Sequence, residues 1–195
     1  MVNKQALQYI LEVSLKMAQM RSLTPLLNYA TEAAIELVGA ERGFVVLKGS
    51  DDDDMDFRIQ QGEQGEELAF RNARDHVSTS VLDRVFEMGE PLVIKDAMKS
   101  SLFGTRESVI MLRLRSIMCA PMIVGGDILG AIYVENRSES NRFAQDDLVP
   151  LVLFANQAAV ATKNTMINDQ LQQAYKVLQE TDKINRTYAR RAIAA

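Results

Sequence analysis

The chain contains one cysteine and one histidine among its 195 residues. A single cysteine excludes an internal disulfide and fits a reducing cytoplasm. One histidine and one cysteine also supply few of the side chains that zinc and iron–sulfur centres require. We therefore expect no metal site and no resident cofactor.

Long apolar runs are also missing. No run reaches the roughly 18–20 residues that cross a bilayer, and the N-terminus lacks the apolar core of a signal peptide. The net charge is −4 and the isoelectric point about 5.2, which disfavours nucleic acid or an anionic membrane as the main partner. With 47% hydrophobic and 25% charged residues, the composition is that of a globular protein. We expect a cytoplasmic location.

Residues 115–136 form the most apolar part of the chain. Two apolar runs flank the sequence Gly125-Gly126-Asp127, whose residues accept the positive φ of a tight turn, so the segment predicts an antiparallel hairpin. Both faces of both arms are apolar, which places these strands in the middle of a sheet covered on each side. Because both faces are alike, alternation leaves open which one would line a cavity.

Other elements follow from periodicity. Residues 5–20 carry apolar residues at helical spacing, and this helix packs either on its own sheet or on a partner chain. A second helix starts with Thr24 as N-cap and Pro25 at the first helical position. Residues 43–48, 56–60 and 92–95 are predicted strands, and a helix capped by Ser78 or Ser80 is predicted to end at Gly89.

The last helix is unusually long. Residues 151–188 contain neither glycine nor proline, so one helix there would extend roughly 57 Å. Its second half carries a narrow stripe at heptad spacing, at Ile167, Leu171, Ala174, Leu178, Thr181, Asn185 and Tyr188. A narrow stripe on a helix that outruns its domain is typical of a coiled coil. We expect this helix to leave the domain and pair with its copy in a homodimer.

In this order and spacing, the elements resemble a GAF domain, the small-molecule sensor module of many signalling proteins. The resemblance covers about residues 22–166. It is carried by GAERGF at 39–44, VLDRVFEMGEP at 81–91, Asp96-Ala97, LRSIMCAP at 114–121, ILGAIYVENR at 128–137, Phe143 with Asp147, and FANQAA at 154–159.

The resemblance implies an α+β fold of α/β/α layers. A six-stranded antiparallel sheet would carry the long N- and C-terminal helices on one face and a ligand pocket on the other. It also implies a dimerisation helix at 1–21, a GAF domain at 22–166 and a signalling helix at 167–195. Such a module relays its signal through the terminal helices to an output domain, in cis or in trans, such as a kinase, a cyclase or a transcription activator.

Subtypes of the GAF family require different residues. The cyclic-nucleotide signature is kept in part: Asn136-Arg137, Phe143 and Asp147 are present, but Arg replaces Lys and Leu148 replaces Glu. An Arg137–Asp147 salt bridge would then be a structural brace, with a cAMP or cGMP receptor as the alternative function. A bilin carrier or a methionine-sulfoxide reductase is disfavoured, because Cys119 lies mid-strand and one thiol cannot complete a disulfide cycle. We expect a sensory and dimerisation module rather than an enzyme, with no role for His76 or Cys119.

A ligand pocket in such a fold needs polar groups that converge on an apolar cavity. By position, the polar candidates are Asp96, Ser108 and Arg115. The candidate apolar walls are Phe44, Met118 and Tyr133. The sequence does not identify the ligand.

Overall fold

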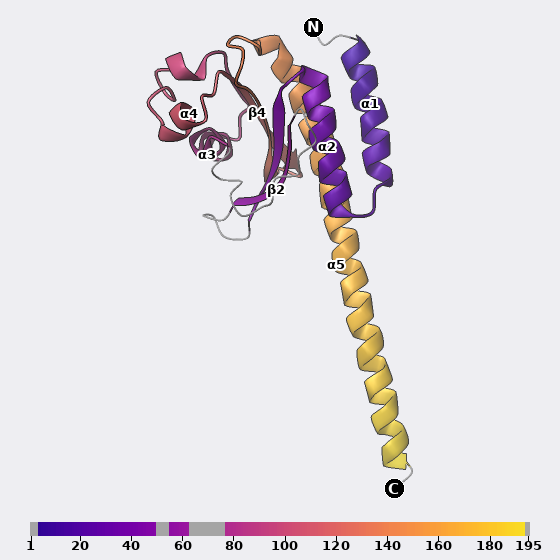
Figure 1. Cartoon of the computed structure of the whole chain (residues 1–195). Coiled ribbons are helices and arrows are strands. Elements are labelled where there is room, and N and C mark those ends of the chain that lie inside the picture. Colours follow the sequence, from indigo (N-terminus) through magenta and orange to yellow (C-terminus); the bar gives the residue numbers. More distant parts are fainter. Residues whose placement is uncertain (1–3, 50–54, 63–76, 194–195) are drawn as a thin grey trace.

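The computed structural model describes residues 4–49, 55–62 and 77–193, with the backbone alone at 55–62, 107–108 and 186–193. Three layers are visible in Figure 1. A central sheet separates the long helices α1 (Lys4–Gln19), α2 (Leu23–Val38) and α5 (Leu148–Ile193) from a layer of short elements. That second layer contains α3 (Thr79–Met88), η2 (Ala97–Lys99) and α4 (Glu107–Met111).

The sheet is antiparallel throughout. Its strands are β1 (Arg42–Lys48), β2 (Met55–Gly62), β3 (Leu92–Ile94), β4 (Ser116–Val124) and β5 (Asp127–Asn136), in the order β2-β1-β5-β4-β3. The expected number of six is therefore wrong for the described residues, which contain five strands. Five strand-like runs are present in the sequence, and the sixth came from the family pattern alone.

The predicted central hairpin is confirmed. Strands β4 and β5 pair from Ser116 with Asn136 to Val124 with Asp127. The two residues between them, Gly125 and Gly126, have φ of 66° and 91°. These are the positive values of a two-residue hairpin turn of the primed kind. β5 is the middle strand of the sheet, with β1 on its other side.

Side chains alternate between the two faces of the sheet. On the helix side, β5 presents Ile132 and Val134, which pack with buried residues of all three long helices. That core includes Met17 of α1, Leu27 of α2 and Phe154 of α5. Helix α1 forms the outer layer and packs against α2 and α5 (Figure 1).

Helices α2 and α5 each begin with a proline in the first turn. Helix α2 begins at Leu23 with Ser22 as N-cap, so the expectation for Thr24 is wrong by two residues. Pro25 still falls in the first turn, where a missing N–H leaves no helical hydrogen bond unmade. Helix α5 follows a 3₁₀ turn, η3 (Gln145–Asp147), and carries Pro150 in its own first turn.

Helix α5 has two different halves. Leu151, Phe154, Ala155, Ala158 and Ala159 are buried against the sheet. From Gln170 to Asn185 every side chain is exposed, and the helix projects beyond the domain (Figure 1). Its 46 residues span about 69 Å at 1.5 Å per residue.

Candidate functional site

The sheet face opposite the long helices is closed by an apolar layer. Strand residues Phe44, Ile117, Cys119 and Tyr133 meet Val81, Leu82 and Val85 of α3, together with Phe103, Val109 and Leu114 from the segment that follows β3. All of them are buried.

Two of the predicted apolar walls lie in this layer. Phe44 and Tyr133 are paired across β1 and β5, with ring centroids 5.8 Å apart at an interplanar angle of 71°. Met118 does not lie here, and its assignment to the pocket wall is wrong. It packs in the helix-side core, because neighbouring residues of a strand point to opposite faces and Cys119 takes the α3 side.

A buried ionic cluster lies at the end of β5 on the same face. The Glu135 side chain is fully buried, and its Oε1 lies 2.9 Å from Nε of Arg137 and 3.4 Å from a guanidinium nitrogen of Arg42. Desolvation raises the pKa of Glu135, and the two arginines oppose that rise. Desolvation in turn lowers the pKa of Arg42, while Glu135 raises it. The pKa of Glu135 is therefore raised by burial even though two arginines lie beside it.

Three buried oxygens on this side have no hydrogen-bond partner in the part of the chain that the structure describes. They are the Tyr133 hydroxyl, Glu135 Oε2 and Asp96 Oδ1. The Tyr133 hydroxyl lies close to the Glu135 carboxyl and the Ser78 backbone, and burial raises its pKa, but neither contact has hydrogen-bond geometry. An unsatisfied buried oxygen costs free energy, so a bound donor group would be stabilised here.

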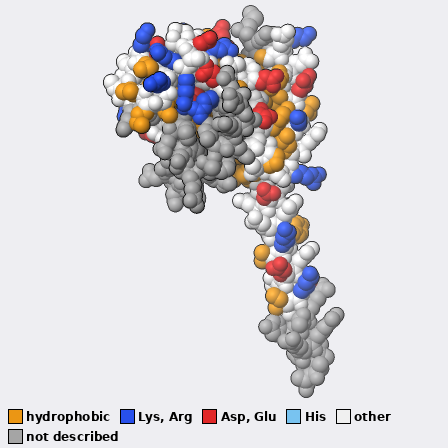
Figure 2. All heavy atoms as spheres, viewed as in Figure 1, with side chains coloured by type: hydrophobic (Ala, Val, Ile, Leu, Met, Phe, Trp, Pro, Cys, Tyr) orange, Lys and Arg blue, Asp and Glu red, His pale blue; other side chains and the backbone are white. Residues whose placement is uncertain are grey.

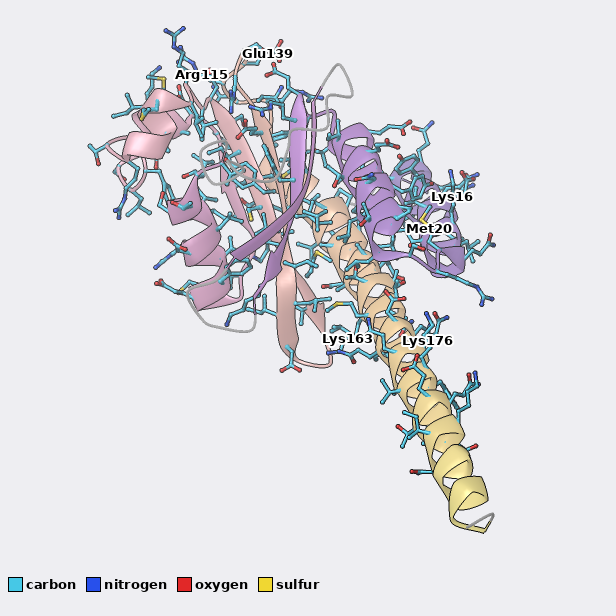
Figure 3. The ribbon with its side chains drawn as sticks, turned by 60° about the horizontal axis from the view of Figure 1, so that its bottom comes forward. Lys16, Met20, Arg115, Glu139, Lys163 and Lys176 are labelled. Atoms are coloured by element: carbon cyan, nitrogen blue, oxygen red, sulfur yellow. The ribbon has the colours of Figure 1, made fainter. Side chains whose placement is uncertain are left out.

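The other predicted polar residues lie at the rim of this layer. Asp96 is partly buried, with its Oδ2 3.7 Å from Nζ of Lys99. The backbone of Arg115 joins three segments, since its N–H donates to the Asn136 carbonyl and its carbonyl accepts from Ala97 at 2.6 Å. Its side chain is half-buried near the end of the sheet (Figure 3). The Ser108 side chain lies outside the described residues.

The residues of the partial cyclic-nucleotide signature make structural contacts. Arg137 pairs with Glu135, while Asp147 Oδ2 accepts a hydrogen bond from the Ala144 N–H at 2.8 Å. Asn136 Oδ1 accepts from the Glu41 N–H at 3.3 Å, and the Glu41 carboxylate accepts from the Arg137 N–H at 2.8 Å. Arg137 is thus next to the end of β5, whereas Asp147 is next to the start of α5.

Other chemistry has little support among the described residues. Cys119 is free and fully buried, and burial raises the pKa of its thiol. No group of three histidine, cysteine, aspartate or glutamate side chains that could hold a metal ion is found where the structure describes the chain. His76 and the aspartates at 51–54 lie outside it.

The sequence interpretation missed Glu135 and Arg42. One available signal was a lone carboxylate at the end of the apolar arm ILGAIYVEN. Arg42 stands 93 residues away from Glu135, so nothing local indicates that the two side chains meet.

Comparison with known proteins identifies the fold. The profile of the GAF domain matches residues 22–162, which include the whole sheet, α2, the short elements of the α3 side and the first part of α5. The chain belongs to the GAF domain family. A region of 111 residues is 25% identical to hybrid signal transduction histidine kinase G of Dictyostelium discoideum, and it spans 55% of this chain but 3% of that relative.

Solved structures agree on the fold. Bacteriophytochrome RpBphP3 from the photosynthetic bacterium R. palustris has a TM-score of 0.68 at 10% identity, covering 92% of this chain and 42% of that one. Free methionine-R-sulfoxide reductase from Neisseria meningitidis has a TM-score of 0.65 at 15% identity, covering 85% and 95%. Both structures therefore share a fold with the chain, and their names indicate different chemistry, a bacteriophytochrome and a reductase.

The described helices include none that combines the length and the apolar character of a membrane span.

Proposed function

We propose that this GAF domain is a non-enzymatic signalling module that forms a homodimer through α1 and α5 and relays a signal along α5 to an output domain. The observation that carries the proposal is an apolar stripe left exposed along α5. Ile167, Leu171 and Leu178 are 48%, 53% and 65% exposed, at the four- and seven-residue spacings of a coiled-coil seam. Single exposed apolar residues are ordinary, but a periodic row of them marks an interaction surface.

The stripe also continues up onto the domain. Leu153 and Val160 are 40% and 43% exposed, and they precede Ile167 at intervals of seven residues. Asn164 and Asn185 occupy the alternate positions of the same heptads. A polar residue at such a position stabilises one register and one number of strands.

Helix α1 extends this surface. A groove of about 90 Å³ runs between α1 and α5, with Ser14 and Ala18 on one side and Val160 and Asn164 on the other. Leu7, Leu11 and Leu15 of α1 are 48%, 61% and 59% exposed. Leu7, Leu11, Ser14 and Ala18 again follow heptad spacing. Figure 2 shows apolar side chains gathered on the helical side of the domain and recurring along α5.

Two copies would bury both stripes in one symmetric bundle. The isologous contact of a two-fold dimer requires the same patch on each subunit, and a stripe on a helix pair meets that requirement. A parallel pairing of α5 would keep the two domains side by side and bring both C-terminal segments together. An output domain attached there, such as the kinase that the relative from Dictyostelium is named for, would receive changes in helix packing directly.

Ligand binding is the second part of the proposal. The layer under α3 is the expected place, because Tyr133, Glu135 and Asp96 each hold a buried oxygen without a partner among the described residues. A ligand with an apolar body and hydrogen-bond donors would suit it. Cyclic-nucleotide binding is the alternative that the partial signature leaves open.

Sedimentation equilibrium tests the dimer. The wild type is expected to sediment as a dimer at micromolar concentration. The double variant Ile167→Asp, Leu171→Asp should sediment as a monomer with an unchanged circular dichroism melting curve for the sheet domain. Gln173→Asp lies on another face of the exposed helix and serves as the control. A monomeric wild type would refute the proposal.

Native mass spectrometry of the purified protein tests the ligand. It reports the number of subunits and any retained small molecule in one spectrum. Titration calorimetry with cAMP and cGMP tests the alternative, and heat release at a stoichiometry of one per subunit would establish it. A flat trace at millimolar nucleotide would remove it.

A further inference from the structure

A second exposed apolar surface lies on the other side of the molecule from the long helices. We call residues 95–115, which include η2 and α4, the basic segment. Within it Met98, Leu102, Ile110 and Met111 are 40%, 66%, 51% and 74% exposed. η2, which holds Met98, contacts α4, which holds Ile110 and Met111, so these three exposed residues lie on neighbouring elements.

The buried residues of the same segment show why that face stays outside. Phe103, Val109 and Leu114 point into the α3-side layer and are nearly or fully buried. Helix α4 is thus anchored through Val109, while the adjacent Ile110 and Met111 remain in solvent. Helix α4 therefore has two apolar side chains, Ile110 and Met111, that do not pack on the domain.

The charge of this surface is opposite in sign to that of the chain as a whole. The basic segment carries five lysines and arginines and two acidic residues, a net charge of +3, within a chain whose net charge is −4. Lys95, Lys99, Arg106 and Arg113 are exposed, and the Lys99 side chain is 83% exposed. Figure 2 shows Lys and Arg side chains beside apolar ones on the part of the domain that lies away from the long helices.

Backbone geometry adds a separate observation. Arg113 has φ of 52°, in the left-handed region that glycine and asparagine occupy most easily. Its N–H and that of Leu114 bond to the carbonyls of Ile110 and Val109, which closes α4. A long cationic side chain at this turn costs about 1 kcal/mol relative to glycine. Arg113 therefore occupies a position where glycine would fold at a lower cost.

A hollow of about 330 Å³ adjoins the basic segment. It lies between α3 and residues 102–106, with Arg84 and Asp83 on one side and Leu102, Phe103 and Arg106 on the other. Its size admits a large side chain, and its charged lining is balanced, with Arg84 and Arg106 alongside Asp83 and Glu87.

We infer that the basic segment is a docking surface for an acidic, amphipathic helical segment of a partner protein. Charge complementarity selects that occupant. A cationic face with exposed methionine, leucine and isoleucine fits a helix that presents apolar residues every third or fourth position between glutamates and aspartates. Methionine adapts to such apolar partners. The surface is separate from the α1–α5 stripe, so a dimer would present it twice.

Peptide display on the immobilised wild-type chain tests the inference. The probe is a library of random 16-residue peptides, and recovered peptides are synthesised with a fluorophore for anisotropy measurements. The expected peptides are net negative, with apolar residues at helical spacing. Their affinity should fall at least tenfold in Met111→Ser, Arg113→Glu and should weaken as salt rises from about 50 to about 500 mM.

Two further variants separate docking from folding. Arg113→Gly relieves the left-handed strain, so it should raise the melting temperature while weakening the peptide several-fold. Met88→Ser with Lys176→Glu makes the same chemical changes elsewhere, at one exposed methionine and one exposed lysine, and should leave the affinity within twofold. These outcomes together would support the surface.

Several results would overturn it. Enrichment of no peptide, enrichment of basic or uncharged peptides, or equal binding by the Met111→Ser, Arg113→Glu variant would each contradict an acidic helical partner. So would binding of the wild type, and not of that variant, to phosphatidylserine vesicles in the absence of any enriched peptide.

Discussion

Nε of Arg137 lies 2.9 Å from Oε1 of Glu135, and the two ends of this pair have very different surroundings. The Glu135 side chain is fully buried, whereas that of Arg137 is 31% exposed. The carboxylate bears most of the desolvation cost, and its pKa is raised although two arginines contact the same oxygen. The strand end on the α3 side is therefore a place where stability depends on pH.

Replacement of Glu135 by glutamine should reveal that dependence. A carboxyl whose pKa is raised on folding binds its proton more tightly in the folded state. Its contribution to stability is complete below the unfolded pKa and is lost as the pH rises through the folded pKa. The free energy of unfolding of the wild type, minus that of Glu135→Gln, should therefore grow as the pH is lowered from 7 to 5. Urea titrations at several pH values measure it.

Glu139→Gln is the control for this experiment, since Glu139 is exposed on the loop after β5 (Figure 3). The difference in the free energy of unfolding between the wild type and Glu139→Gln should stay constant between pH 7 and pH 5. A Glu135→Gln difference that shrinks on acidification would mean that the arginines outweigh burial.

The thiol of Cys119 should not react with alkylating reagents in the folded protein. Its thiol is inaccessible, and burial raises its pKa, so the reactive thiolate is absent near neutral pH. We expect iodoacetamide at pH 8 to label the protein only in denaturant, as read by mass spectrometry. Rapid stoichiometric labelling of the native chain would instead reopen a catalytic or chromophore-bearing role for this residue.

The two glycines of the β4–β5 turn should respond differently to asparagine. Gly125 has φ of 66°, which asparagine adopts readily, and no atom of another residue approaches its missing side chain. Gly125→Asn should therefore change the free energy of unfolding by less than about 0.5 kcal/mol. Gly126, at 91°, lies further from the asparagine minimum, and Gly126→Asn should cost about 1 kcal/mol. Equal effects would argue against the primed turn.

Local sequence pattern predicted the elements that depend on local chemistry. The glycine pair fixed the hairpin, and the absence of glycine and proline predicted α5, which runs from Leu148 to Ile193. Sequence could not decide which hairpin face meets which layer, because both are apolar. Met118 was assigned to the wrong face for that reason, and only the packing of α3 and α5 separates it from Cys119.

The candidate site was predicted less well, for a physical reason. Phe44 and Tyr133 were placed by their strands, whereas the ionic cluster joins Arg42 to Glu135 across 93 residues. Such a contact depends on strand order. β1 pairs with β2 along one edge and, along the other, with β5, which is distant in sequence. The sixth strand had no run of its own in the sequence, and five are present in the described part of the chain.

Disulfide trapping at Leu171 shows whether two copies pair in parallel and in register along the exposed stripe of α5. Leu171→Cys and, as control, Gln173→Cys are each introduced into the chain, whose native thiol is buried. In a parallel pair, equivalent seam residues face each other within disulfide range, while residues on the outer face do not. We expect mild oxidation to convert Leu171→Cys almost completely to a covalent dimer and to leave Gln173→Cys monomeric on non-reducing gels. Equal crosslinking of the two variants, or none in either, would contradict it.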